Sequence, residues 1–222
     1  VTNAKTAEMA KLTENSCRDV QIAFANELSI ICDNFGIDIW ELINLANRHP
    51  RINILKPGPG VGGHCIAVDP WFIVGSADGE AKLIKTARER NLYKQKWTIL
   101  KIKTAIEKWK AKSLSIDSGR SIQKINDGDQ NESPKCSSSP RIALFGLTFK
   151  PNIDDLRESP ALEIAKQLTS EFSNIICVEP NLSAEVIHLE KLTIVSIDQA
   201  LKESDIIIFL VAHNSFKKIS ID

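Results

Sequence analysis

The last third of the chain alternates short apolar runs with amphipathic helical patterns, and this alternation narrows the possible folds more than any other feature. Three runs have the length and continuous apolar character of buried strands: RIALFGLTF (141–149), NIICVEP (174–180) and DIIIFLV (205–211). Helical patterns lie between them at 160–172 and 196–204. The alternation predicts a parallel, Rossmann-like sheet. Ligands on such sheets bind beyond the carboxyl ends of the strands, so we expect a binding edge at 150–160.

The first half of the chain carries helical patterns instead. Apolar residues recur at helical spacing over residues 4–34 without an internal Gly or Pro, and Gly36 is placed to end that helix. Asp38 and Glu41 resemble a capping box at the start of a second helix. Residues 79–112 read as one long helix or two abutting ones. This part of the chain is therefore predicted to be all-α.

A polar stretch separates the two patterns. Residues 114–139 are rich in Ser, Asn, Asp, Gly and Pro and have hardly any apolar periodicity, which favours a linker. Cys136 lies inside it, where an unassisted thiol is more often incidental than catalytic. We expect an α/β chain in three parts: a central helical domain (1–113), the linker (114–139) and a partial Rossmann-like domain (140–222).

Charge and cysteine usage limit the function classes. Lys+Arg and Asp+Glu balance at 28 each, so the overall field attracts neither nucleic acid nor an anionic membrane. The basic stretch 82–112 is more typical of a solvated helix face than of a polyanion-binding surface. The five cysteines form no CxxC pair and have no zinc-site histidine spacing, which predicts no metal, no disulfide framework and a reducing cytoplasm. The longest apolar runs are too short to span a bilayer.

The stretch GPGVGGHCIAVDP (58–70) is the strongest candidate for a site. Its glycines let backbone approach a ligand closely, its prolines stiffen the loop, and it presents the thiol of Cys65 with Asp69 four residues later. Cys65 is a candidate nucleophile, although a buried cysteine in a tight turn fits the spacing equally well. Lys11 and Asn15 offer a cation and an amide suited to a developing oxyanion, but spacing alone does not bring them to Cys65.

Three other patterns have simple structural explanations. Gly58, Gly60 and Gly63 spell the dinucleotide fingerprint GxGxxG, which needs a strand before it and a helix immediately after it. Here HCIAVDP follows, and Pro70 would break the first turn of such a helix. Arg18 continues the helical stripe of Lys11 and Asn15, where solvated surface is the default. His49 and Arg51 flank Pro50, where packing or capping is as plausible as ligand binding.

Three motifs in this order and separation resemble one family. AKLTEN (10–15), HPRINILKPGPGVGGHCIAVDP (49–70) and FGLTFKPNIDDLRESPALEI (145–164) are similar to the central and C-terminal regions of the UDP-glucose/GDP-mannose dehydrogenase family. The resemblance covers nearly the whole chain except the linker. Within the family, GGHCIAVDPWF is most like members that oxidise UDP-N-acetyl-D-mannosamine, with those that oxidise UDP-N-acetylglucosamine close behind.

The resemblance implies two successive NAD-dependent oxidations at C6 of a UDP-N-acetylhexosamine, alcohol to aldehyde to carboxylate. It implies that Cys65 forms a thiohemiacetal and then a thioester, with Lys11, Asn15 and Asp69 assisting proton transfer, oxyanion binding and water activation. Further residues match family positions that contact the substrate or, for the last of them, the NAD pyrophosphate: Arg18, His49, Arg51, Lys56, Gly60, Gly62, Phe149, Lys150 and Arg157. In the family Arg51 reaches a neighbouring subunit, and the long first helix forms a homodimer.

One departure from the family is large. The family begins with an NAD-binding Rossmann domain, and this sequence shows no such fingerprint. We therefore expect a fragment that has no dehydrogenase turnover alone. Two other classes stay open: a non-catalytic nucleotide-sugar-binding or dimerisation module, and a cysteine hydrolase using Cys65 with a histidine. The hydrolase is disfavoured because His64 is adjacent to Cys65 while His188 and His213 lie in no motif.

Overall fold

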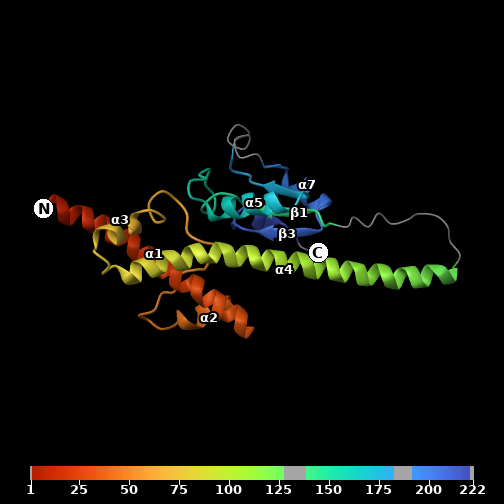
Figure 1. Ribbon diagram of the computed structural model, residues 1–222, viewed down its shortest axis with the longest axis horizontal. Coiled ribbons are helices and arrows are strands. Elements are labelled where there is room, and N and C mark those ends of the chain that lie inside the picture. The colour runs from red at the N-terminus through yellow and green to blue at the C-terminus, as the bar shows by residue number, and fades with distance from the viewer. Residues whose placement is uncertain (1, 128–138, 183–191, 221–222) are drawn as a thin grey trace.

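Two long helices and a small α/β unit make up the protein in a computed structural model, which describes residues 2–127, 139–182 and 192–220. Helix α1 (Ala4–Phe35) packs along helix α4 (Lys82–Asp127), and the α/β unit lies against one side of α4 (Figure 1). Asn3 caps the start of α1 by accepting from the Thr6 amide, and Gly36 ends it in the left-handed conformation. The predicted first helix and its glycine stop are thus confirmed.

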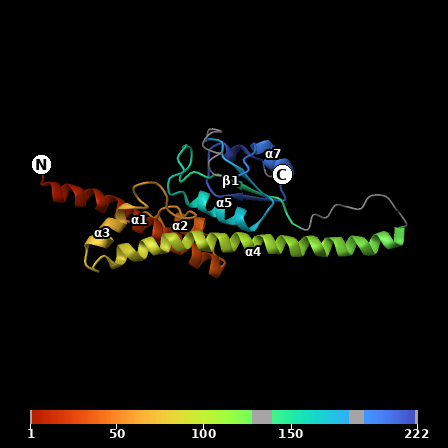
Figure 2. The same ribbon diagram turned by 45° about the horizontal axis from the view of Figure 1, so that its top comes forward.

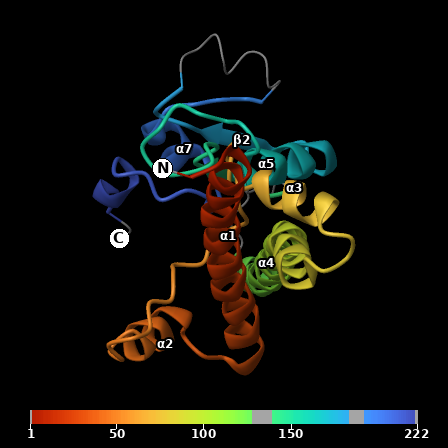
Figure 3. The ribbon, with the colours of Figure 1, turned by 90° about the vertical axis from the view of Figure 1, so that its left-hand side faces the viewer.

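Two short helices flank the glycine-rich loop. Helix α2 (Ile39–Ala46) begins where the Asp38 carboxylate accepts from the amides of Trp40 and Glu41, as predicted. It lies away from the sheet (Figure 3). Helix α3 (Asp69–Ser76) has a proline in its first turn, Pro70. A proline is tolerated there because the first amides of a helix have no intrahelical acceptor, so the expectation that Pro70 would break a following helix was wrong.

Helix α4 extends further than the sequence indicated. It is a single helix of 46 residues. It continues to Asp127, whereas the sequence placed a linker from residue 114. Local propensity was the only guide to this stretch, and propensity is a weak predictor. The division of the chain into the domains 1–113 and 140–222 stays a prediction.

The sheet has three parallel strands in the order β2-β1-β3. These are β1 (Ile142–Phe145), β2 (Ile175–Val178) and β3 (Ile206–Phe209), connected by helices α5 (Pro160–Glu171) and α7 (Ile197–Glu203). The last element is a 3-10 turn, η1 (Phe216–Lys218). Ile142 pairs with Ile175 on one side and with Ile206 on the other. The predicted parallel α/β architecture is confirmed, but β3 is an edge strand whose Ile207 and Phe209 stay exposed.

Both faces of the sheet are covered. Helix α5 lies between the sheet and α4 (Figure 2), and Ile99, Ile102 and Ile106 of α4 join α5 and β1 in one buried cluster. On the opposite face α7 and Phe216 of η1 pack on β1 and β2. Each fully buried aliphatic or aromatic side chain contributes about 1.5–3 kcal/mol of transfer free energy. The α/β unit is therefore anchored to α4 through an apolar core.

The contact between α1 and α4 is polar instead. The buried residues of α1 are small or polar: Asn15, Ser16, Asp19, Ala23, Ala25, Asn26, Ser29 and Cys32. The large apolar residues that indicated the helix point elsewhere, and Phe24 and Phe35 are 53% and 74% exposed. None of the helices in the described ranges is long and apolar enough to cross a membrane.

Candidate active site

The glycine-rich loop is attached at its start to α1. The Gly58 amide donates to Asn26 Oδ1 over 2.9 Å, and Asn26 is fully buried between α1 and α4. Residues 52–58 form no strand, so GxGxxG lacks the strand that a dinucleotide fingerprint requires. GxGxxG is therefore not a dinucleotide fingerprint here, although helix α3 does follow it at Asp69.

The glycines of this loop allow it to dock against the α/β unit. A Cβ on Gly60 would lie 2.9 Å from Pro160 Cβ, and one on Gly62 would lie 2.7 Å from Phe149 Cβ. Gly63 has φ +88°, and a Cβ there would meet the Phe149 ring at 2.9 Å. The Gly63 amide also donates to the Arg157 carbonyl over 3.0 Å. The close approach is thus to the 149–160 loop of the protein itself, and contact of Gly60 and Gly62 with substrate stays a prediction.

Three of the predicted catalytic residues lie together. The Cys65 carbonyl accepts from the amides of Val68 and Asp69 over 3.0 and 2.8 Å, which forms the turn that starts α3. Asp69 Oδ2 accepts from Asn15 Nδ2 over 2.5 Å, although 54 residues separate them in sequence. Cys65 is half-buried. The thiol therefore lies in a turn whose carboxylate is held by an amide from α1.

Lys11 lies one helical turn before Asn15 on α1. Its side chain is 63% exposed, and its Nζ is 3.4 Å from Glu14 Oε2. Side chains four residues apart share a helix face, so Lys11 and Asn15 both extend from the same side of α1. The structure gives no contact between Lys11 and Cys65, and a role for Lys11 at the thiol stays a prediction.

A second charged pair lies beside the thiol. Arg157 Nε and Nη2 donate to the two carboxylate oxygens of Asp155, the shortest bond being 2.6 Å. These hydrogen bonds lower the pKa of Asp155 to about 2 and raise the pKa of Arg157. The Gly63 amide, two residues before Cys65, donates to the Arg157 carbonyl over 3.0 Å, which places this pair beside the thiol loop. Arg157 is thus a fixed cation at the edge of the Cys65 site, and sequence patterns had not singled out Asp155.

The remaining predicted residues lie around the site or away from it. Lys150 is exposed, and its Nζ lies 5.6 Å from the centre of the Phe149 ring. His49 Nδ1 accepts from the Arg51 amide over 3.2 Å, a local capping contact. Three predicted substrate cations are exposed and have no described contact with the Cys65 turn: Arg18, Arg51 and Lys56.

A buried polar network behind the loop was not predicted from the sequence. Arg88 Nη1 and Asn91 Nδ2 donate to Asp19 Oδ1 over 2.5 and 2.8 Å, and Asn26 Nδ2 donates to Asn91 Oδ1 over 2.9 Å. Burial raises the pKa of Asp19, and the charge of Arg88 opposes that rise. The network continues through Asn26 to the Gly58 amide, so packing of α1 on α4 fixes the start of the loop.

A cavity beside the thiol loop does not include the thiol. A pocket of about 570 Å³ lies between α4, α5 and the two loops, with Trp71, Arg88, Gln95, Glu158 and Lys166 among its lining residues. Cys65 is not one of them. The described residues also contain no group of three or more His, Cys, Asp or Glu side chains that could hold a metal ion. We therefore place the candidate chemistry at the Cys65 turn because the polar groups converge there.

The fold and the site define a protein of two parts. The loop that carries Cys65 belongs to the helical part, and it meets the loop 149–160 at the strand ends of a parallel α/β unit of the kind that binds nucleotides. Residues 5–93 match the central domain, and residues 143–222 the UDP binding domain, of the UDP-glucose/GDP-mannose dehydrogenase family. The chain belongs to this family.

Relatives of known activity are similar over the whole chain. The UDP-N-acetyl-D-mannosamine dehydrogenase of Escherichia coli K12 is 52% identical over 100% of this chain and 49% of its own length. The NDP-N-acetyl-D-galactosaminuronic acid dehydrogenase of Ralstonia solanacearum is 48% identical over 100% of this chain and 46% of its own length. The chain thus spans about half the length of the curated relatives it matches.

Solved structures agree with this assignment. The UDP-N-acetyl-mannosamine dehydrogenase of S. aureus superposes with a TM-score of 0.74 at 37% identity, over 99% of this chain and 44% of that one. The corresponding enzyme of Pyrococcus horikoshii gives a TM-score of 0.72 at 30% identity, over 99% and 45%.

Proposed function

We propose that the chain forms the thiol-bearing part of an NAD-dependent nucleotide-sugar 6-dehydrogenase that acts on UDP-N-acetyl-D-mannosamine. One observation carries the proposal: Asn15 of α1 donates to Asp69, 54 residues later in the sequence, and Asp69 lies in the same turn as Cys65. The similarity to UDP-N-acetyl-D-mannosamine dehydrogenases supports the choice of sugar.

The chain's own groups suit capture of an aldehyde. The Cys65 sulfur adds to the C6 aldehyde to form a thiohemiacetal, and oxidation of that adduct gives a thioester. Asn15 and Lys11 stabilise the oxyanion, and Lys11 returns the proton. Asp69, held by Asn15, accepts a proton from the water that hydrolyses the thioester to a carboxylate and frees the thiol. Covalent capture keeps the aldehyde bound between the two oxidations.

One residue on the described surface fits the cofactor. When bound, NAD supplies a hydride acceptor for each of the two oxidations. Arg157 is 63% exposed, lies near Cys65 and is held by Asp155, which suits a planar cation that binds a pyrophosphate.

The test is loss of the nucleophile. Because the chain spans about half the length of its relatives, it is joined to an NAD-binding domain of the family, and NADH formation from UDP-N-acetyl-D-mannosamine is followed. Cys65→Ala is expected to lower kcat by more than about 1000-fold, as for other lost nucleophiles. Cys17→Ala, a change at an exposed cysteine of α1, is the matched control and should keep activity. Substrate binding with no NADH formation in the unsubstituted protein would instead favour a non-catalytic binding module.

The exposed apolar side of α1 supports a homodimer. Phe24, Ile31 and Phe35 project from the side of α1 that α4 does not cover, and Trp40 and Leu45 of α2 are also exposed. Single exposed apolar residues are common, whereas five on two helices that contact each other are typical of an interface. We propose a second copy of the chain as the occupant. Phe24→Glu with Phe35→Glu should convert a dimer to a monomer in light scattering, whereas a monomeric unsubstituted protein would contradict the proposal.

A further inference from the structure

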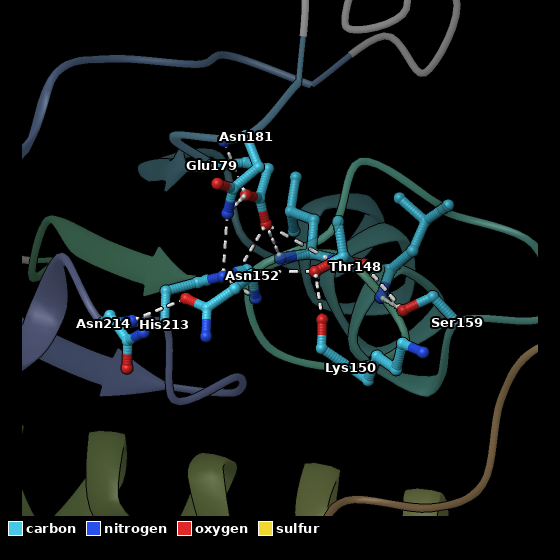
Figure 4. Close-up of polar contacts among 10 residues, drawn as sticks. Thr148, Lys150, Asn152, Ser159, Glu179, Asn181, His213 and Asn214 are labelled. Atoms are coloured by element: carbon cyan, nitrogen blue, oxygen red, sulfur yellow. Dashed lines mark hydrogen bonds and ion pairs between the residues drawn. The ribbon is translucent and has the colours of Figure 1, made fainter.

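The carboxyl ends of the three strands are joined by one buried carboxylate. Glu179 follows β2, Leu147 and Thr148 follow β1, and His213 comes after β3 (Figure 4). The side chains of Glu179 and His213 are 0% exposed. No charge pattern or motif in the sequence had indicated that Glu179 and His213 would contact each other, so we looked for what their contact does.

Both oxygens of Glu179 are occupied by donors of the protein. Oε2 accepts from the amides of Leu147 and Thr148 over 2.7 and 3.3 Å and contacts His213 Nε2 at 3.0 Å. Oε1 accepts from the backbone and side-chain amides of Asn181 over 3.0 and 3.3 Å. A buried carboxylate with this many donors is well satisfied. It has no oxygen free for a ligand.

The contacts of His213 define its tautomer. Its Nδ1 accepts from the Asn152 amide over 2.9 Å, so the ring proton lies on Nε2 and is donated to Glu179. The Asn152 side chain also contacts the residue after His213: its Oδ1 accepts from the Asn214 amide over 2.8 Å. The neutral ring thus links the carboxylate to the far end of the β1 loop.

Glu179 directly follows β2, a position where an acidic residue can have a function in ligand binding. In nucleotide-binding α/β folds, the acidic residue that follows the second strand commonly binds a ribose hydroxyl. Here that side chain turns inward and accepts from the amides of Leu147 and Thr148, before Phe149. His213, which contacts Glu179, accepts from the amide of Asn152, after Phe149. Thr148 Oγ1 also donates to the Lys150 carbonyl over 3.0 Å.

We propose that Glu179 and His213 are positioning residues for the 147–152 loop and do not contact the nucleotide. The loop presents Phe149 and Lys150 at the strand-end edge and supports Gly63 through the Phe149 ring. The ligand part of this inference rests on the proposed function. The part about the loop rests on the hydrogen bonds alone.

Amide hydrogen exchange tests the loop without any ligand. Glu179→Gln is expected to speed exchange at Leu147 and Thr148 by at least about tenfold, the loss of one hydrogen bond. The matched control is Glu203→Gln, which removes the 2.6 Å pair with Arg141 before the start of β1. It should leave the 147–152 amides unchanged. Unchanged exchange in Glu179→Gln would overturn the proposal.

A second variant keeps the test decisive if Glu179→Gln fails to fold. His213→Gln retains a side-chain amide that can donate to Glu179 but removes the Nδ1 acceptor of the Asn152 amide. Exchange should therefore rise at Asn152 while Leu147 stays protected. Equal effects at both ends, or none at Asn152, would contradict the assigned tautomer and the positioning role.

Calorimetry with UDP and its 2′-deoxy analogue separates positioning from direct contact. If Glu179 positions the loop, Glu179→Gln weakens both ligands by the same factor, about tenfold or more. Selective loss of UDP binding would show a direct ribose contact and overturn the proposal, as would unchanged affinities. If the unsubstituted chain binds neither ligand, the proposed function fails while the exchange result still decides the role of Glu179.

Discussion

A buried lysine between α1 and α4 makes the stability of the protein change with pH in the alkaline range. Lys94 on α4 is 5% exposed, and its Nζ donates to Ser29 Oγ over 2.7 Å and lies 3.6 Å from the centre of the Trp97 ring. Burial lowers the pKa of Lys94 to about 8, against the charge of Asp33, which raises it. The ammonium is therefore held in a site that favours the neutral amine.

The size and sign of the effect follow from that pKa. A fall from 10.5 to about 8 corresponds to about 3 kcal/mol of penalty on the charged form of folded Lys94. Between these pH values the unfolded chain binds the proton and the folded chain does not, so stability rises with pH. The penalty is fully present below pH 8 and is relieved as the pH approaches 10.5.

Lys94→Met removes the charge and keeps the aliphatic stem. The lost hydrogen bond costs about 1 kcal/mol, so the variant should be about 2 kcal/mol more stable at pH 7. Ser29 Oγ still donates to the Asn26 carbonyl over 2.6 Å, which leaves its proton satisfied. The advantage should vanish near pH 10, where the unsubstituted protein carries a neutral Lys94.

Urea denaturation of both proteins at several values between pH 7 and 10 measures this difference. Other groups also titrate in this range, but their contributions to the free energy of unfolding cancel in the difference between the two proteins. Lys96→Met, at an exposed lysine on the same helix, is the control and should show no such trend. A constant difference between Lys94→Met and the unsubstituted protein across the range would refute the reasoning.

Four further substitutions, one of them a control, are tested by urea denaturation. Gly62→Ala would overlap the Glu158 carbonyl and should cost at least about 2 kcal/mol, whereas Gly75→Ala meets nothing within 4 Å in α3 and should gain about 0.5–1 kcal/mol. Arg88→Met leaves a buried carboxylate unpaired and should cost about 3–5 kcal/mol. Asp155→Asn should be less stable than the unsubstituted protein above pH 4, and the difference should disappear as the pH falls towards 2, because the lowered pKa of Asp155 makes its stabilisation depend on the charged form.

Elements with local signals were predictable from the sequence. Gly36 and Asp38 mark helix ends through conformations and hydrogen bonds that involve only adjacent residues. The parallel sheet was predictable because β1 and β2 are buried on both faces and therefore read as continuous apolar runs. The end of α4 was not, because no apolar periodicity marks its last turns.

The candidate site was only partly predictable. Cys65 and Asp69 lie four residues apart, and their loop was evident from its composition. The contact of Asn15 with Asp69 depends on how α1 packs, which the family resemblance supplied and spacing did not. Glu179 and His213 left no pattern because several of their partners are backbone amides, which every sequence provides.

The polar contact between α1 and α4 explains why these helices can hold a site in register. An apolar face tolerates sliding, and a slip of one helical turn shifts a residue by about 5.4 Å. Such a slip would carry Asn15 away from Asp69. Asp19, Arg88 and Asn91 meet in one register only, because any other would leave a buried charge unpaired. The buried charges thus specify the register of α1 against α4. A variant that replaces them by apolar residues should keep both helices but lose the alignment of Asn15 with the thiol loop.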